Sequence, residues 1–261
     1  MNTDTRLQQV VSAPTTTLDA DDDQFPDALE AANGLTVGIR DNNVFLSDKL
    51  FVMQLYRDIL HREGDSGGVQ FYQNQIDSGL MTRSQLVLNL LASPESQAGV
   101  GALARLYIGG LHRLPDPNGM EFWITKMNDG TSLSQIAASF AASNEFNAKY
   151  GSLTNKAFVD QLYIDVQGRV ADTGGETRWV DALNHGTSRG EVLLGFSEST
   201  EFKAASDANL NIAVAYLGLL GRSAHQFGYD FWTDQQDSGV PDITIIGEFI
   251  ASHEYHDRFM P

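Results

Sequence analysis

A motif that recurs four times constrains this chain more than any other feature. In each copy an arginine stands six residues after a tyrosine, a glycine twelve residues after it and an aromatic residue sixteen after it. The four tyrosines are Tyr56, Tyr107, Tyr163 and Tyr216, just over fifty residues apart. Self-similarity at a fixed period is the sequence signature of a repeat architecture. The chain is therefore predicted to be a tandem repeat.

Several other positions recur in register with these tyrosines. By position they are Arg62, Arg113, Arg169 and Arg222; Asp65, Asp116, Asp172 and His225; Gly68, Gly119, Gly175 and Gly228; Tyr72, Trp123, Trp179 and Trp232; and Glu95, Glu145, Glu201 and Glu254. Chance does not hold this many positions in register across four copies.

Each copy is predicted to form three short helices. Its first segment carries apolar residues at i, i+4 and i+8, as in Phe51, Leu55 and Ile59, which is the spacing of one helix face. The fold class is therefore all-α, a tandem array of four three-helix repeats that is α-solenoid-like. We place the repeats at residues 47–98, 99–151, 152–206 and 207–261.

The recurring acidic residue has two interpretations. Asp65, Asp116 and Asp172 stand where a second helix begins, and an aspartate there caps the first amides. Calcium is the alternative, but one carboxylate falls well short of the six to eight oxygens that this ion takes. We therefore interpret these residues as helix caps.

The recurring arginines and aromatic residues are also interpreted as structural. Each arginine is expected to pair with the closing glutamate of its copy, in preference to binding a ligand. Trp123, Trp179 and Trp232 are flat enough to stack on sugar rings, but their identical place in each copy favours the core. Their alternative role is carbohydrate binding.

An acidic segment, residues 1–46, precedes the repeats. Residues 35–46 alternate apolar and polar around Asp41, which predicts a small β-hairpin. Upstream, five acidic residues stand at positions 1, 3, 5, 9 and 12 of an EF-hand-like loop, a spacing that wraps oxygens around calcium. They are Asp19, Asp21, Asp23, Asp27 and Glu30.

Three features of this segment oppose the calcium interpretation. Gln24 occupies the position where the loop requires glycine, Pro26 follows it, and no helix precedes the loop. The alternative is a helix that begins at Pro26, carries acids in its first turn and ends at Asn33–Gly34. We therefore expect no obligatory cofactor and keep calcium as a candidate ligand of Asp19, Asp21, Asp23 and Glu30.

Composition narrows the partners. The formal net charge is −17, which repels phosphate backbones and anionic lipid, so we expect no nucleic acid partner. Cysteine is absent, which excludes disulfides and thiolate chemistry. The first twenty residues are polar and do not form a cleavable signal peptide, and we expect no membrane insertion.

The repeated pattern resembles the DUF4214 family, also described as phycobilisome-linker-like. The second copy carries it most completely, in Leu106–Tyr107, Arg113, Pro115–Asp116, Phe122–Trp123 and Ser143–Phe146. The resemblance covers about residues 50 to 260, and His225 departs from it. Such a resemblance implies a part of a bacterial S-layer, adhesin or secreted protein, some of which attach to lipopolysaccharide or capsule.

The expected function is a non-enzymatic adhesion module that recognises a surface polysaccharide, since the sequence offers no nucleophile or base. A structural linker that organises other surface or particle proteins is the alternative, and an oligomer is compatible with either. The expected location is the cell surface or the extracellular space, with the cytoplasm as the alternative.

Overall fold

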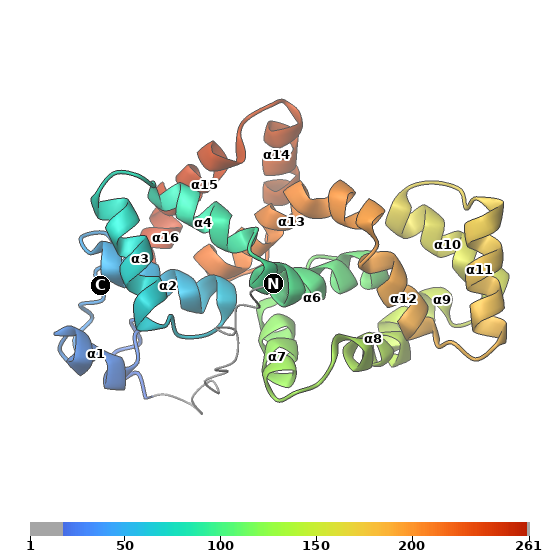
Figure 1. The fold of residues 1–261 in the computed structure, drawn as a ribbon, viewed down its shortest axis with the longest axis horizontal. Coiled ribbons are helices and arrows are strands. Elements are labelled where there is room, and N and C mark those ends of the chain that lie inside the picture. The colour runs from blue at the N-terminus through green and yellow to red at the C-terminus, as the bar shows by residue number, and fades with distance from the viewer. Residues whose placement is uncertain (1–17, 260–261) are drawn as a thin grey trace, which may run out of the picture.

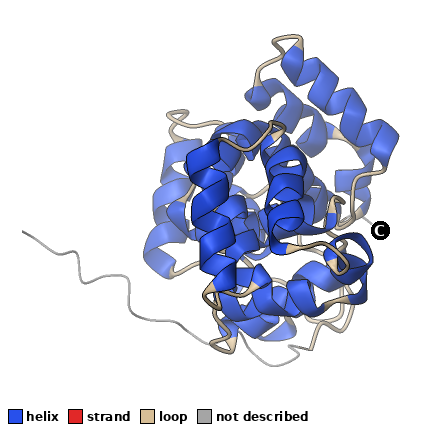
Figure 2. Cartoon of the chain, turned by 90° about the vertical axis from the view of Figure 1, so that its right-hand side faces the viewer, coloured by secondary structure: helices blue, strands red, loops and turns tan. Residues whose placement is uncertain are grey.

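The protein is an all-helical repeat array. A computed structural model describes residues 18–259, and Figure 2 shows helices joined by loops with no strand in this range. The opening part of the predicted acidic segment, residues 1–17, lies outside the described residues. None of the described helices is both long and apolar enough to cross a membrane.

Four units follow the short helix α1 (Asp27–Asn33), as Figure 1 shows. We call them units 1 to 4. The main helices of unit 1 are α2 (Asp48–Leu60), α3 (Ser66–Asp77) and α4 (Arg83–Leu91), and those of unit 2 are α6 (Val100–Leu106) with the π-helical η2 (Tyr107–Leu111), α7 (Pro117–Asn128) and α8 (Leu133–Ala142). Unit 3 consists of α10 (Asn155–Gln167), α11 (Thr173–Asn184) and α12 (Arg189–Ser197). Unit 4 consists of the second half of α13 (Thr200–Leu220), α14 (Gln226–Asp237) and α15 (Asp242–Ala251).

Each unit also closes on a short helical segment that starts at its Ser-x-Glu sequence. These segments are α5 (Pro94–Ala98), α9 (Asn144–Tyr150), the first half of α13, and α16 (His253–Asp257). In all four the serine side chain accepts a hydrogen bond from the amide three residues on, which is an N-cap.

The second helix of a unit begins at an aspartate in three of the four copies. Asp65, Asp116 and Asp172 each accept a hydrogen bond from the amide of the glycine three residues on, at 2.8–2.9 Å. This is the arrangement expected of N-caps. His225 takes the same backbone position without a side-chain cap bond, so unit 4 lacks this interaction.

A close contact between the repeated tyrosine and glycine brings the second helix of each unit against the first. A Cβ atom on Gly68, Gly119, Gly175 or Gly228 would lie only 2.0–2.8 Å from the tyrosine hydroxyl of its unit. Real Cβ atoms do not approach an oxygen so closely. Only glycine therefore lets the second helix lie against the tyrosine.

The recurring tryptophans pack inside their units. Trp123, Trp179 and Trp232 are partly buried, and each ring lies 5.5–5.6 Å from a phenylalanine ring of the third helix. The same phenylalanine meets the repeated tyrosine edge-on, with centroids 4.8–4.9 Å apart. Such tilted and edge-to-face pairs are the favoured aromatic geometries.

Every unit contains the expected arginine–glutamate pair. Its guanidinium also lies over the repeated tyrosine, with the carbon 4.9–5.0 Å from the ring centroid. The pairs are Arg62–Glu95, Arg113–Glu145, Arg169–Glu201 and Arg222–Glu254. Because these side chains are roughly two-fifths exposed, each pair adds at most about 1 kcal/mol to stability.

The units do not stack in chain order as an open solenoid would. Unit 1 packs on unit 4 through α4 and α15, and unit 2 packs on unit 3 through α8 and α12 (Figure 1). The long α13 crosses the middle, where it contacts both α2 and α6. The array is therefore closed, with its first and last units in contact.

Small residues occupy equivalent positions in both pairings. A Cβ atom on Gly190 of α12 would lie 2.7 Å from the Cα of Ala138 in α8, so the two helix backbones nearly touch. Ser84 of α4 and Gly247 of α15 occupy the equivalent repeat positions and also meet, with 3.6 Å from a Gly247 Cβ to the Ser84 hydroxyl.

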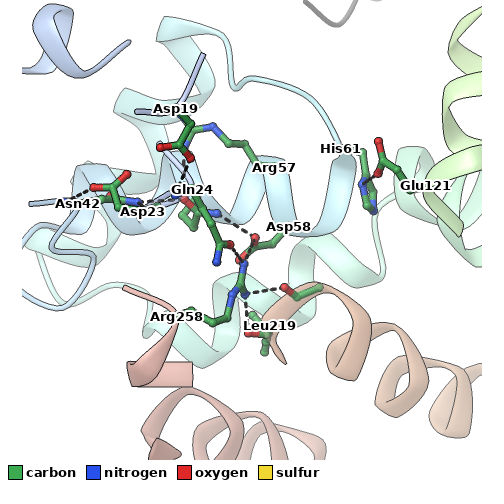
Figure 3. Close-up of polar contacts among 12 residues, drawn as sticks. Asp19, Asp23, Gln24, Asn42, Arg57, Asp58, His61, Glu121, Leu219 and Arg258 are labelled. Atoms are coloured by element: carbon green, nitrogen blue, oxygen red, sulfur yellow. Dashed lines mark hydrogen bonds and ion pairs between the residues drawn. The ribbon is translucent and has the colours of Figure 1, made fainter. Parts of the chain in front are cut away.

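One largely buried arginine joins each pair of units. Arg105 of unit 2, with its side chain fully buried, donates to Glu198 of unit 3 at 2.8 Å, and it also donates to Gln97 of α5 in unit 1 at 2.8 Å. Arg258 connects units 1 and 4 in the same manner: its guanidinium lies 2.8 Å from Asp58 and donates to the carbonyl of Gly218 at 2.7 Å (Figure 3).

The predicted β-hairpin at residues 35–46 is wrong. This stretch consists of turns and irregular backbone. Its polar residues form hydrogen bonds within the stretch and to the acidic loop, in place of a strand ladder. Asp41 accepts from the amide of Thr36 at 2.9 Å, and the amide of Asn42 donates to Asp23 at 2.9 Å.

We predict opposite effects for two adjacent glycines of α11. A Cβ on Gly175 would lie 2.0 Å from the Tyr163 hydroxyl, whereas one on Gly174 meets nothing closer than 3.4 Å. Gly175→Ala should destabilise the protein by about 1–3 kcal/mol through this clash. Gly174→Ala should be neutral or stabilising by up to ~1 kcal/mol. Urea unfolding of both variants is the measurement, and equal effects would refute the tyrosine–glycine contact.

We also predict that Arg258 contributes far more than a surface arginine. Arg258→Met leaves Asp58 buried without its charge partner, which should cost about 3–5 kcal/mol of unfolding free energy. Arg222→Met removes a pair of similar shape that is well exposed, and should cost ~1 kcal/mol or less. Thermal and urea unfolding compare the two, and similar losses would show that unit 4 does not depend on the Arg258 contact.

Candidate functional site

The most unusual group of side chains lies in the acidic loop, which we define as residues 19–30. Here the aspartates organise the backbone around themselves. The amide of Gln24 donates to Asp19 at 3.0 Å, that of Asp23 to Asp21 at 3.3 Å, and that of Phe25 to Asp23 at 2.9 Å. Aspartate side chains commonly stabilise turns in this way.

The loop turns sharply enough to require a left-handed backbone at two residues. Asp22 has φ 59° and Gln24 has φ 67°. Gln24 stands at the loop position where glycine was expected from the EF-hand spacing, so it adopts the conformation that glycine would supply. The absence of glycine is therefore compatible with the turn.

Asp23 connects the loop, through hydrogen bonds, to the segment that precedes unit 1. It is fully buried, and so is Asn42. The Asn42 backbone amide donates to the Asp23 carboxylate at 2.9 Å, and its side-chain amide donates to the Asp23 carbonyl at 3.3 Å (Figure 3). This contact also brings the neighbouring Asp41 against the loop.

Two groups of three carboxylates meet at Asp23. Asp19, Asp21 and Asp23 form the first, and Asp23, Glu30 and Asp41 form the second. Within each group, one oxygen from every residue lies within 4.8 Å of the others. Negative charges so close together repel one another strongly unless a proton or a cation is present.

Many oxygens in this cluster have no protein partner. Both carboxylate oxygens of Glu30 are buried without a hydrogen bond, and so are one oxygen each of Asp19, Asp21 and Asp41. Buried polar atoms are almost always hydrogen-bonded, so orphaned oxygens require an explanation. Each of the three aspartates uses its other oxygen to accept a backbone amide.

Burial and charge both act on the acidity of these groups. Burial raises the pKa of Glu30 above its ordinary value, and the nearby Asp21, Asp23, Asp27 and Asp41 raise it further. Burial also raises the pKa of Asp19. The loop therefore holds carboxylates in a place that disfavours their charged form.

The structure places the four residues proposed as calcium ligands in two groups that share Asp23, with Asp19 and Asp21 in the first and Glu30 in the second. It sets Asp27 apart, because that carboxylate accepts from the amide of Ala20 at 2.8 Å. Sequence reasoning missed Asp41. Its only signal was the polar Asp-Asn-Asn string, which was interpreted as a hairpin turn.

A cleft of about 230 Å³ lies where units 1, 2 and 4 meet. It is lined by apolar residues together with Asp58, Asn118, His61 and Glu121. The His61 Nδ1 and a Glu121 carboxylate oxygen are 3.7 Å apart (Figure 3), and the nearby His61 side chain lowers the pKa of Glu121. No serine, threonine or lysine is among the lining residues, and the volume is small for a drug-sized ligand.

Comparison with known proteins identifies the repeats. The family model described as "Domain of unknown function (DUF4214)" matches residues 42–100, 103–148 and 137–206, more than half of the chain. Unit 4 lies outside these matches but has the same tyrosine–glycine contact and arginine–glutamate pair as the others. Neither the curated proteins nor the solved structures gave a match. The chain belongs to the DUF4214 family.

Proposed function

We propose that this protein is a non-enzymatic binding module of a bacterial cell surface or secreted particle, and that it recognises a surface polysaccharide. The supporting observation is an exposed phenylalanine at the same position of three units. Phe71, Phe122 and Phe231 precede the core aromatic residue of the second helix and are 45–55 % exposed.

Each exposed ring is held in place by its neighbour in the sequence. The ring centroids of Phe122 and Trp123 are 4.8 Å apart in an edge-to-face arrangement, and the Phe231–Trp232 and Phe71–Tyr72 pairs are alike at 4.9 and 5.2 Å. Because the tryptophan is anchored in the core, the phenylalanine is preorganised. A rigid aromatic surface loses little entropy on binding.

The helix surface beside each ring suits a sugar. Three residues before each phenylalanine stands the repeated glycine, and three residues after it stands Asn74, Thr125 or Asp234. Residues three apart are neighbours on a helix surface. The residue three positions on therefore offers a hydrogen-bonding group beside the ring for a hydroxyl of a pyranose whose CH face covers the ring.

Valency and charge support a repetitive, uncharged ligand. Equivalent weak sites on one rigid array gain affinity by avidity when the ligand repeats as well, and a polysaccharide repeats by construction. The formal charge of −17 disfavours strongly anionic chains. Unit 3 differs, because Arg178 replaces the phenylalanine and lies 5.3 Å from the Trp179 ring centroid, so three such sites are proposed.

The test is binding of the whole chain to isolated cell-surface polysaccharides on a glycan array, followed by calorimetry on any hit. The triple variant Phe71→Ala, Phe122→Ala, Phe231→Ala should lose at least tenfold in affinity, because all three stacking surfaces are removed. The control Arg178→Ala changes the equivalent position in unit 3 and should bind like the parent. All of these positions are exposed, so folding should be nearly unchanged.

Two results would contradict this function. Binding that survives the triple substitution would show that the phenylalanines are not the contact surface. Failure to bind any glycan, together with stoichiometric and phenylalanine-dependent binding to a surface or particle protein, would favour the structural-linker alternative.

A further inference from the structure

We propose that the acidic loop, together with Asp41 beside it, binds one Ca²⁺ ion through Asp19, Asp21, Asp23, Glu30 and Asp41. This proposal concerns a different part of the molecule from the exposed phenylalanines and does not depend on them. Its principal support is Glu30, which is fully buried and has no hydrogen-bond partner on either carboxylate oxygen.

No hydrogen bond from the protein stabilises a negative charge on Glu30. It is the last acidic residue of the loop, on α1, and it shares a group with Asp23 and Asp41 whose oxygens lie within 4.8 Å of one another. An unpaired buried carboxylate is strongly unfavourable in proteins. A divalent cation between these oxygens supplies the missing partner and offsets the repulsion between the carboxylates.

The spacing of the oxygens fits calcium. Calcium–oxygen bonds are about 2.3–2.6 Å long, so ligands on opposite sides of the ion lie roughly 4.6–5.2 Å apart. The oxygens in each group lie within 4.8 Å of one another. Five orphaned carboxylate oxygens, from Asp19, Asp21, Asp41 and both atoms of Glu30, are available, and Asp23 belongs to both groups.

The two carboxylate oxygens of each of three aspartates have different surroundings, which supports the same conclusion. Asp19, Asp21 and Asp41 each accept a backbone amide on one oxygen and leave the other buried and unpaired. The first oxygen builds the loop, and the second is left for a ligand. Calcium accepts irregular arrangements of this kind, whereas Mg²⁺ requires near-ideal octahedral geometry at shorter distances. We therefore expect calcium to be preferred.

Calcium in this loop would also stabilise the closure of the array. The loop reaches Asp58 through Asn42 and Gln54, with Asn42 donating to Gln54 at 3.2 Å and Gln54 donating to Asp58 at 2.9 Å. Asp58 pairs with Arg258 of unit 4, and Arg258 in turn donates to the side chain of Gln24 in the loop (Figure 3). This hydrogen-bond network joins the loop, unit 1 and the C-terminal end of unit 4.

The experiment is a titration of the chelator-treated whole chain with calcium chloride by calorimetry, with thermal unfolding in parallel. We expect one ion per chain and a Tm increase of about 5 °C or more at a calcium concentration ~100 times Kd. Magnesium chloride should bind more weakly. No heat and no Tm shift at millimolar calcium would overturn the proposal.

Four variants locate the site. Glu30→Gln should weaken calcium binding at least 100-fold, and Asp41→Asn at least tenfold. Asp27→Asn should stay within about threefold of the parent, because Asp27 lies outside both groups and an asparagine oxygen can still accept from Ala20. Glu248→Gln changes an exposed glutamate on α15 and serves as the matched control.

The Glu30 variant also tests whether loss of binding reflects misfolding. Since burial disfavours the Glu30 charge, calcium-free Glu30→Gln should unfold at the same temperature as the calcium-free parent or at a higher one. If Glu30→Gln is folded and still binds calcium with parental affinity, the proposed ligand set is wrong. Equal losses of calcium affinity in Asp27→Asn and Asp41→Asn would favour the ligand set of the EF-hand spacing, which includes Asp27, over the set proposed here.

Discussion

The rest of the structure depends on one steric constraint, the contact between a tyrosine and a glycine in each unit. The tyrosine hydroxyl occupies the space that any other side chain would need, so the second helix lies directly against the first. In units 2 to 4 the third-helix phenylalanine then meets both the tyrosine and the tryptophan, as in unit 3. In every unit the arginine covers the tyrosine ring while pairing with the closing glutamate. The recurring residues therefore form one continuous packing unit, which explains why they recur together.

Closure of the array adds a second level that the repeat itself does not specify. Units 1 and 4 meet through the same helix faces as units 3 and 2, with Ser84 equivalent to Gly190 and Gly247 equivalent to Ala138. The residues that join the pairs, Arg105 and Arg258, are not repeated. Most recurring positions are occupied in packing, caps and ion pairs. The recognition that we propose therefore uses the exposed phenylalanines, which recur in three units without being buried in the core, and the acidic loop.

Local structure was predictable from the sequence because its signals are local. An aspartate three residues before a glycine predicts a cap, and the arginine and glutamate of each copy predict a pair; both contacts are present. The pairing of units was not predictable, since apolar periodicity shows which face of α4 is buried but not that α15 covers it. Asp41 was missed for a similar reason. Its neighbour Asn42 is held by Asp23, a contact between residues far apart in the chain that overrides the hairpin suggested by alternation.

Unit 4 packs on unit 1 in the closed array, and this contact can be measured directly because the chain contains no cysteine. Ser84 and Gly247 lie opposite each other on α4 and α15, with 3.6 Å from a Gly247 Cβ to the Ser84 hydroxyl, which suits a disulfide between their Cβ positions. The double variant Ser84→Cys, Gly247→Cys should form an intramolecular disulfide under mild oxidation, detected by mass spectrometry of the monomer and its peptides. Two free thiols, or disulfides only between chains, would contradict the closed array.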